Sequence, residues 1–159
     1  MQEVHVASPD GRLQFTVLPN AERRTFTASV AIFSAPLVTI AANPETILKS
    51  PAVDVIKSVL PVWDETIVLP DSEIGELAAY ARRKGNTWFL AIMNGPQPKT
   101  LHVPMSFLTE GEYKAATVRD NPTDDARVEM ENTIRKRTDS LDISLREGGG
   151  LLARFSASK

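Results

Sequence analysis

The fold of this chain is decided by the stretch Gly85-Asn86-Thr87-Trp88-Phe89-Leu90-Ala91-Ile92-Met93. The Gly-Asn pair is a turn signal, and the apolar run after it has the length and aromatic content typical of a strand. Short runs of period-two alternation continue on both sides, separated by turn-forming residues such as Pro70-Asp71 and Gly148-Gly149-Gly150. This pattern predicts a mainly β protein with an antiparallel β-sandwich over residues 61–159. The expected strands cover residues 66–69, 76–82, 87–93, 100–103, 113–119, 128–135, 140–145 and 151–155.

The first part of the chain has a different pattern. Two alternating runs, residues 4–7 and 13–17, flank the type I turn signal Ser8-Pro9-Asp10-Gly11 and predict an N-terminal hairpin. Helical spacing follows between residues 25 and 58 and predicts one or two helices, the last ending before Pro61. We therefore divide the chain into residues 1–60, a hairpin and helical segment that pack on the sandwich, and residues 61–159, the sandwich itself.

The composition excludes several classes of function. The chain carries 18 basic and 20 acidic residues, and its net charge of −2 gives no broad field to hold nucleic acid or an anionic membrane. Cysteine is absent, which excludes disulfides, thiolate zinc sites and a cysteine nucleophile. The only histidines, His5 and His102, lack the spacing of a metal motif, so we expect no metal and no cofactor.

Nothing in the sequence predicts a membrane-spanning segment or a signal peptide. The longest apolar stretch, residues 28–42, is interrupted by serine, threonine and proline and is too short to span a bilayer. The opening Met1-Gln-Glu-Val-His-Val shows no basic and apolar regions of a signal peptide. We expect a soluble protein and assign no compartment.

Several motifs resemble one known family. They are Pro61-Val-Trp-Asp-Glu-Thr66, Ile74-Gly75-Glu76, Ala81-Arg-Arg-Lys-Gly-Asn-Thr-Trp88 and the late triple glycine. Together they are similar to the C-terminal part of glycoside hydrolase family 97, a family of retaining and inverting α-glucosidases and α-galactosidases. The hairpin around Ser8-Pro9-Asp10-Gly11 faintly resembles the start of the family's N-terminal β-domain, a pattern that chance hairpins also give.

The resemblance implies which parts of such an enzyme are missing. Family members carry a large N-terminal β-domain and a (β/α)8 barrel before the matching region, and 159 residues are too few for either. The family's nucleophile, general acid or base and calcium-binding glutamates lie in those parts, and none corresponds to a residue here. Catalytic residues are therefore left unknown. The chain resembles a truncated hydrolase in which an internal deletion joins the first hairpin to the last domain.

Carboxylates are the residues that a newly assembled glycosidase site would use, because glycoside hydrolysis requires two carboxyl groups across the scissile bond. The candidates by type are Asp64, Glu65, Glu76, Glu110, Glu112, Asp120, Asp124 and Asp125. With 20 acidic residues present, some pair reaches a suitable separation by chance, so no pair is assigned. A serine nucleophile such as Ser34 or Ser106 beside a histidine lacks the Gly-x-Ser-x-Gly elbow. The basic runs 82–84 and 135–137 are expected to be solvated flanks of turns.

Trp63 and Trp88 are the candidate carbohydrate contacts, because a pyranose ring stacks its C–H face on an indole. Packing is the competing role, and we favour it for both residues. Trp63 stands where the family's chain enters its C-terminal β-domain, and Trp88 begins an apolar run. Two Trp, two Tyr and six Phe are also few for a dedicated carbohydrate-binding module.

Three functions remain open. The main hypothesis is a noncatalytic β-sandwich remnant of a family 97-like hydrolase that binds carbohydrate weakly or serves in assembly. The enzyme alternative is a small glycosidase or other hydrolase with a new carboxylate site. The structural alternative is a homo-oligomer formed through the helical segment around Val30 to Ala41, because monomers avoid leaving an apolar helix face in water.

Overall fold

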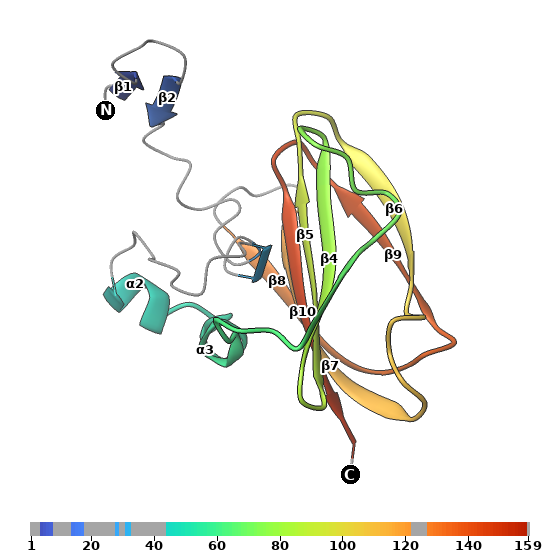
Figure 1. Cartoon of the computed structure of the whole chain (residues 1–159). Coiled ribbons are helices and arrows are strands. Elements are labelled where there is room, and N and C mark those ends of the chain that lie inside the picture. Colours follow the sequence, from blue (N-terminus) through green and yellow to red (C-terminus); the bar gives the residue numbers. More distant parts are fainter. Residues whose placement is uncertain are drawn as a thin grey trace.

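The computed structural model describes residues 4–7, 14–17, 28, 31–32, 44–121 and 127–158. Figure 1 shows the elements in chain order. They are β1 (Val4–Ala7), β2 (Gln14–Val17), α2 (Pro44–Leu48), α3 (Val53–Ser58), β3 (Glu65–Val68), β4 (Leu77–Lys84), β5 (Thr87–Asn94), β6 (Lys99–Pro104), β7 (Glu112–Asp120), β8 (Val128–Lys136), β9 (Ser140–Leu145) and β10 (Gly150–Ala157). Every strand expected after Pro61 is present, so the predicted β-sandwich is confirmed.

The strands after Pro61 form two antiparallel sheets that face each other. A six-stranded sheet has the order β3-β4-β5-β10-β7-β8, and we call it the large sheet. The pair β6-β9 forms a two-stranded sheet, which we call the small sheet. The chain leaves the large sheet after β5, enters the small sheet as β6, and returns to the large sheet as β7. The last strand, β10, inserts between β5 and β7 and ties the two halves of the large sheet together.

The sandwich core lies between the two sheets. Alternate residues of each strand point into it, as the period of two requires. Trp88, Leu90 and Ile92 supply the centre from β5, while Ile143 faces them from the small sheet. Phe107, in the connection after β6, packs its ring between Trp88 and Phe155, with centroids 5.5 Å and 5.7 Å away. Aromatic pairs at these separations add to the stabilisation that burial alone provides.

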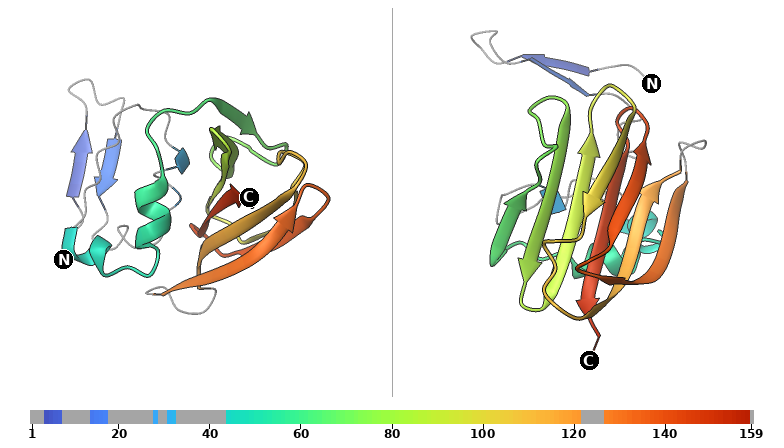
Figure 2. Two further views of the ribbon diagram at one scale, coloured as in Figure 1. Left: turned by 90° about the horizontal axis from the view of Figure 1, so that it is seen from below. Right: turned by 90° about the vertical axis from the view of Figure 1, so that its right-hand side faces the viewer.

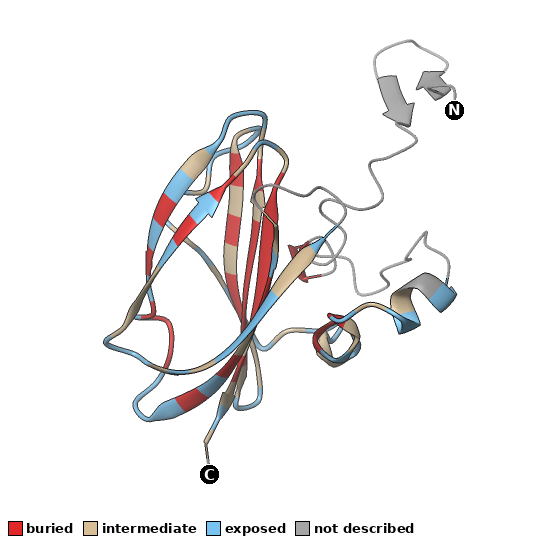
Figure 3. Ribbon diagram, turned by 180° about the vertical axis from the view of Figure 1, so that it is seen from behind, coloured by how far each residue is buried: buried red, intermediate tan, exposed pale blue. Residues whose placement is uncertain are grey.

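The outer face of the large sheet carries a second apolar cluster beneath helix α3. Val55 and Ile56 of α3 pack with Phe89, Val118 and Leu152 of the sheet. Figure 2 shows α3 on the side of the large sheet opposite to the small sheet. Because both faces of β5 are covered, its residues from 88 to 92 are all buried (Figure 3). A strand buried on both faces has a continuous apolar run in place of strict alternation.

The N-terminal predictions are only partly within the described residues. Strands β1 and β2 form the expected hairpin, with Val4 opposite Val17. Ala28, Ala31 and Ile32 are helical and buried, and α3 ends at Ser58, before Pro61 as predicted. The predicted contact segment around Val30 to Ala41 otherwise lies outside the described residues. No helix within the described ranges is both long and apolar enough to cross a bilayer.

Candidate functional site

A cavity of about 540 Å³ opens at the end of the sandwich where the turn between β4 and β5 faces the connection between β6 and β7. We call it the end cavity. Its wall combines an indole, charged side chains and amides or hydroxyls, a mixture suited to a polar organic ligand. The residues that line it are Glu65, Ile67, Arg83, Gly85, Asn86, Trp88, Ser106, Phe107, Thr109, Glu110, Tyr113, Arg137 and Ala157.

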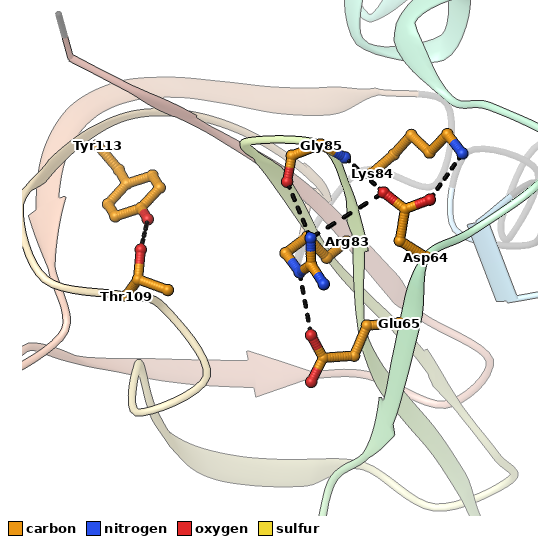
Figure 4. A network of polar contacts seen from close by, with 7 residues as sticks. All are labelled: Asp64, Glu65, Arg83, Lys84, Gly85, Thr109 and Tyr113. Carbon is orange, nitrogen blue, oxygen red and sulfur yellow. Dashed lines mark hydrogen bonds and ion pairs between the residues drawn. The ribbon is translucent and has the colours of Figure 1, made fainter.

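Arg83 organises the charged side of the end cavity (Figure 4). Its Nε donates a hydrogen bond of 3.0 Å to Glu65 Oε2, and its Nη1 donates one of 3.2 Å to the Gly85 carbonyl. The guanidinium carbon also lies 5.8 Å from the centre of the Trp88 ring. On β4 and β3, Arg83 is directly opposite Glu65, which explains why the two side chains meet. The ion pair with Arg83 thus fixes the orientation of the Glu65 carboxylate.

Asp64 secures the turn that closes the cavity. Its Oδ1 accepts a 2.7 Å hydrogen bond from Lys84 Nζ, and its Oδ2 accepts a 2.8 Å bond from the Gly85 amide. These two bonds, first that from Lys84, lower the pKa of the Asp64 carboxyl below its ordinary value. Gly85 has φ of +56°, a left-handed conformation that glycine adopts readily. Asp64 therefore holds the tight turn between β4 and β5.

The two tryptophans lie on opposite faces of the large sheet. Trp88 is only 3% exposed and belongs to the sandwich core, so little of its ring faces the end cavity that it lines. Trp63 is half-buried on the outer face, where it meets Phe89 edge to face at 5.3 Å. Both rings are thus engaged in packing. A carbohydrate contact at either residue stays a prediction.

The other candidate carboxylates are distributed over separate ion pairs and turns. Glu76 pairs with Lys99 at 3.2 Å, and Glu112 pairs with Lys136 at 3.1 Å. Glu110 lies at the cavity rim, 3.9 Å from Arg137. Asp120 accepts a 2.7 Å hydrogen bond from the Gly150 amide. Asp124 and Asp125 fall outside the described residues.

In the described part of the chain no hydrogen bond joins a histidine to a serine, and the partner of His102 is a carboxylate. His102 Nδ1 lies 2.7 Å from Asp142 Oδ1 on the exposed face of the small sheet. Ser106 lines the end cavity. His5 belongs to β1, whose side chains are not described, and Ser34 lies outside the described residues. In the described ranges no three His, Asp or Glu residues gather in a way that could hold a metal ion.

Arg82 differs from the expectation for its basic run, because it is 2% exposed and therefore not a solvated turn flank. It shares the outer face of the large sheet with Tyr80, and its guanidinium carbon lies 5.5 Å from the ring centres of both Tyr80 and Trp63. Its Nη2 donates a 2.9 Å hydrogen bond to the Ile32 carbonyl. Burial lowers the pKa of this guanidinium. Arg82 thus ties the helical segment to the sandwich, and its place two residues after Tyr80 was the available sequence signal.

Exposed apolar side chains form a second candidate surface. Among the described residues the large ones are Leu48, Leu60, Val62, Val68, Ile74, Met130 and Ile134. None of them belongs to the small sheet, whose exposed residues include Thr100, His102, Asp142 and Ser144. They lie instead in α2, in the segment that follows α3, in the connection between β3 and β4, and on the two edge strands of the large sheet. Met130 and Ile134 lie on the same face of β8, two alternations apart, and neighbouring exposed apolar groups are typical of a contact surface.

Known proteins match this chain over most of its length. Residues 62–156 match the family model described as glycosyl-hydrolase 97 C-terminal, oligomerisation. A retaining α-galactosidase of Bacteroides thetaiotaomicron is 30% identical over 132 residues, which are 80% of this chain and 20% of that protein.

Solved structures give the same result for the fold. A glycoside hydrolase family 97 enzyme from Pseudoalteromonas sp. strain K8 superposes with a TM-score of 0.78 at 24% identity, over 91% of this chain and 24% of that one. A β-arabinopyranosidase superposes with a TM-score of 0.66 at 27% identity, over 80% of this chain and 20% of that one. The chain therefore spans about a fifth to a quarter of the length of these relatives.

Proposed function

This chain belongs to the glycosyl-hydrolase 97 C-terminal family, and we propose that it is a noncatalytic β-sandwich domain whose function is self-association. The observation that carries the proposal is the distribution of exposed apolar side chains. They lie on the two edge strands of the large sheet, in the connection between β3 and β4 and beside the helices, whereas the exposed residues of the small sheet include Thr100, His102, Asp142 and Ser144. A surface of this kind is stabilised when a partner covers it.

The arrangement of the carboxylates supports a noncatalytic role. Glu65 is held by Arg83, and Asp64 is held by Lys84 and the Gly85 amide. A general acid in a glycosidase needs a raised pKa, which apolar burial or a neighbouring carboxylate provides. The pKa of Asp64 is shifted in the opposite direction, because its partners stabilise the charged form.

Sedimentation velocity over a wide range of protein concentration tests the proposal. We expect the sedimentation coefficient to rise with concentration towards that of a dimer or larger assembly. A monomer at every concentration would overturn it. Turnover of aryl α- and β-glycosides that is lost on Glu65→Gln or Glu110→Gln would overturn the noncatalytic part, and an unrelated protein prepared in the same way is the control.

The end cavity supports carbohydrate binding as a second candidate function. Its volume of about 540 Å³ lies in the range of small-molecule sites, and Glu65, Arg83 and Asn86 offer hydrogen-bonding groups beside Trp88. Saturation-transfer NMR with a panel of monosaccharides and disaccharides tests this function. We expect signals that weaken in Asn86→Ala and persist in Thr100→Ala, a control on the small sheet. Equal signals from both variants would remove the cavity as the site.

The helical segment supplies one candidate surface for self-association. The described residues near it include Leu48 of α2 and Leu60 after α3, both exposed. We also propose that residues 1–60 act as one unit that packs on the sandwich of residues 61–159, for which the Arg82 bond to Ile32 is the supporting contact. Leu48→Lys, compared with the wild type in sedimentation velocity, tests whether this surface contributes.

A further inference from the structure

The two edges of the large sheet are built differently. The edge strand β3 has four residues, and Glu65 at its start is tied to Arg83. The edge strand β8 has nine residues, and no described strand pairs with its free side. An edge strand presents unpaired backbone N–H and C=O groups, and natural proteins protect long ones because these groups can pair with another chain. The long edge of β8 therefore requires an explanation.

The charges of β8 are segregated along the strand. Its sequence is Val128-Glu-Met-Glu-Asn-Thr-Ile-Arg-Lys136. Both acidic residues come before Asn132 and both basic residues come after Ile134, so the centre of the strand is uncharged. Charged side chains are one of the devices that protect an edge strand against pairing, and the residues of β8 from Asn132 to Ile134 carry none. A strand with opposite charges at its two ends is complementary to itself when it runs antiparallel.

The pairing of β8 with β7 assigns its residues to the two faces. Glu131 and Arg135 lie opposite Thr117 and Tyr113, on the side of the small sheet. Met130 and Ile134 lie opposite Val118 and Lys114, on the side of α3. Met130 is 39% exposed and Ile134 is 52% exposed. The free edge thus has Glu131 and Arg135 on one face. On the other face Met130 and Ile134 lie on either side of Asn132, and we call these two apolar side chains the apolar row.

We propose that β8 pairs with β8 of a second copy of this chain, antiparallel about a two-fold axis at Thr133. This inference rests on the proposed function of self-association and names its surface. Pairing about Thr133 places Glu131 directly opposite Arg135 of the second copy, and Arg135 opposite its Glu131. Opposite charges across two strands stabilise the pair, and so do facing threonines. The interface is the same patch on both copies, as a two-fold axis requires.

The same two-fold axis also places the apolar row of one copy beside the apolar row of the second copy. Ile134 lies opposite Asn132 of the second copy and diagonal to its Ile134, and Met130 lies diagonal to that same isoleucine. Diagonal neighbours in an antiparallel pair have Cα atoms about 7–8 Å apart, within reach of long side chains. Two exposed side chains of each copy are thereby covered by one contact.

The existing ion pairs show why Glu131 and Arg135 are the charges left for a partner. Glu129 is already bound by Arg119 at 2.7 Å, and Lys136 is bound by Glu112 at 3.1 Å. Within one chain, Glu131 and Arg135 reach each other only at 4.0 Å, along the strand. Pairing of two copies replaces this long contact with two direct cross-strand pairs.

Charge reversal tests the inference. In Glu131→Lys two lysines face two arginines, and in Arg135→Glu four carboxylates face one another, so each variant alone repels itself. An equimolar mixture of the two variants restores both opposite-charge pairs. We expect sedimentation velocity to show self-association weakened on the order of tenfold or more in each variant, and a heterodimer in the mixture. Asp142→Lys on the small sheet makes the same change of charge and should associate like the wild type.

The outcomes separate this inference from the proposed function. Variants that dimerise as the wild type does, or a mixture that forms no heterodimer, would overturn the β8 pairing while leaving self-association through another surface. A wild-type monomer at all concentrations would overturn both. Thermal unfolding of each variant, followed by circular dichroism, verifies that the charge changes leave the sandwich folded.

Discussion

The outward-facing side of the small sheet and that of the large sheet follow opposite rules. In β6 and β9, buried and exposed residues alternate, with Leu101, Val103 and Ile143 inside and Thr100 and Asp142 outside. On the large sheet, the outward residues Phe89, Val118 and Leu152 are buried beneath α3. Outside that covered centre, Val68, Met130 and Ile134 remain exposed.

The difference indicates which side of the sandwich is suited to the proposed self-association. A sheet face that ends in water needs only polar side chains, and the small sheet has them. The large sheet has an apolar outer face whose centre is covered by the described helical residues, including those of α3. This side of the molecule is therefore the one that association is expected to complete.

Truncating Phe89 should have the largest effect on stability. Its side chain is buried in the cluster beneath α3, and its ring packs edge to face against Trp63. We expect Phe89→Ala to lower the free energy of unfolding by about 3–5 kcal/mol, and Leu90→Ala on the opposite face of β5 by about 2–5 kcal/mol. Urea unfolding followed by circular dichroism measures both. A loss below about 1 kcal/mol for Phe89→Ala alone would mean that the outer cluster is not a second core.

Replacing Arg82 should have the next largest effect. Arg82→Met keeps much of the apolar stem but leaves the Ile32 carbonyl without this donor. An unpaired buried acceptor costs about 1–3 kcal/mol, so we expect a loss of that size in urea unfolding. Arg83→Met, at the exposed end cavity, is the matched control and should cost less than about 1 kcal/mol. Equal losses in the two variants would contradict the special role of Arg82.

A lysine substitution on the outward face of each sheet should distinguish an effect on self-association from an effect on stability. We expect Ile134→Lys and His102→Lys to change the free energy of unfolding by less than about 0.5 kcal/mol, since both side chains are exposed. Only Ile134→Lys should weaken self-association in sedimentation velocity. Weakening by His102→Lys as well would show that the small sheet also takes part.

The smallest effect should be the pH dependence that Asp64 contributes. Its pKa is lowered from the ordinary 3.8, so the folded state binds this proton less readily than the unfolded chain does. The stabilisation is therefore present above pH 3.8 and is lost as the pH falls through the lowered pKa. An NMR titration of the Asp64 carboxyl carbon measures the shift, and Lys84→Met should move the pKa back upward. An unchanged pKa in that variant would contradict the assigned cause.

Much of the sandwich was predictable because period and turn residues are local properties. The Gly85-Asn86 pair and the glycines from Gly148 onward predict turns, and the structure has turns there. Gly85 and Gly148 both have positive φ. The sequence could not show that β10 inserts between β5 and β7, because strand order depends on contacts between distant residues. The apolar run from Trp88 to Met93 predicts a strand, but the sequence does not show what covers its second face. The structure shows that α3 packs on that face.

The candidate sites were less predictable for the same reason. Residue types alone identified eight carboxylates, whereas their partners, such as Arg83 for Glu65, follow from the pairing of β3 with β4. Arg82 and Arg83 are neighbours in one basic run, yet alternation buries the first and leaves the second at a cavity rim. The charge segregation of β8 is visible in the sequence, but its meaning depends on β8 being an edge strand.

Disulfide trapping tests the difference between the two faces most directly, because the natural sequence contains no cysteine. Facing residues in an antiparallel pair have Cα atoms about 4.5–5.5 Å apart, a separation that a disulfide can bridge. We expect Thr133→Cys to form a covalent dimer under mild oxidation, and Ser144→Cys on the small sheet to remain monomeric. Equal trapping of both variants, or none at Thr133→Cys, would contradict association through the β8 edge of the large sheet.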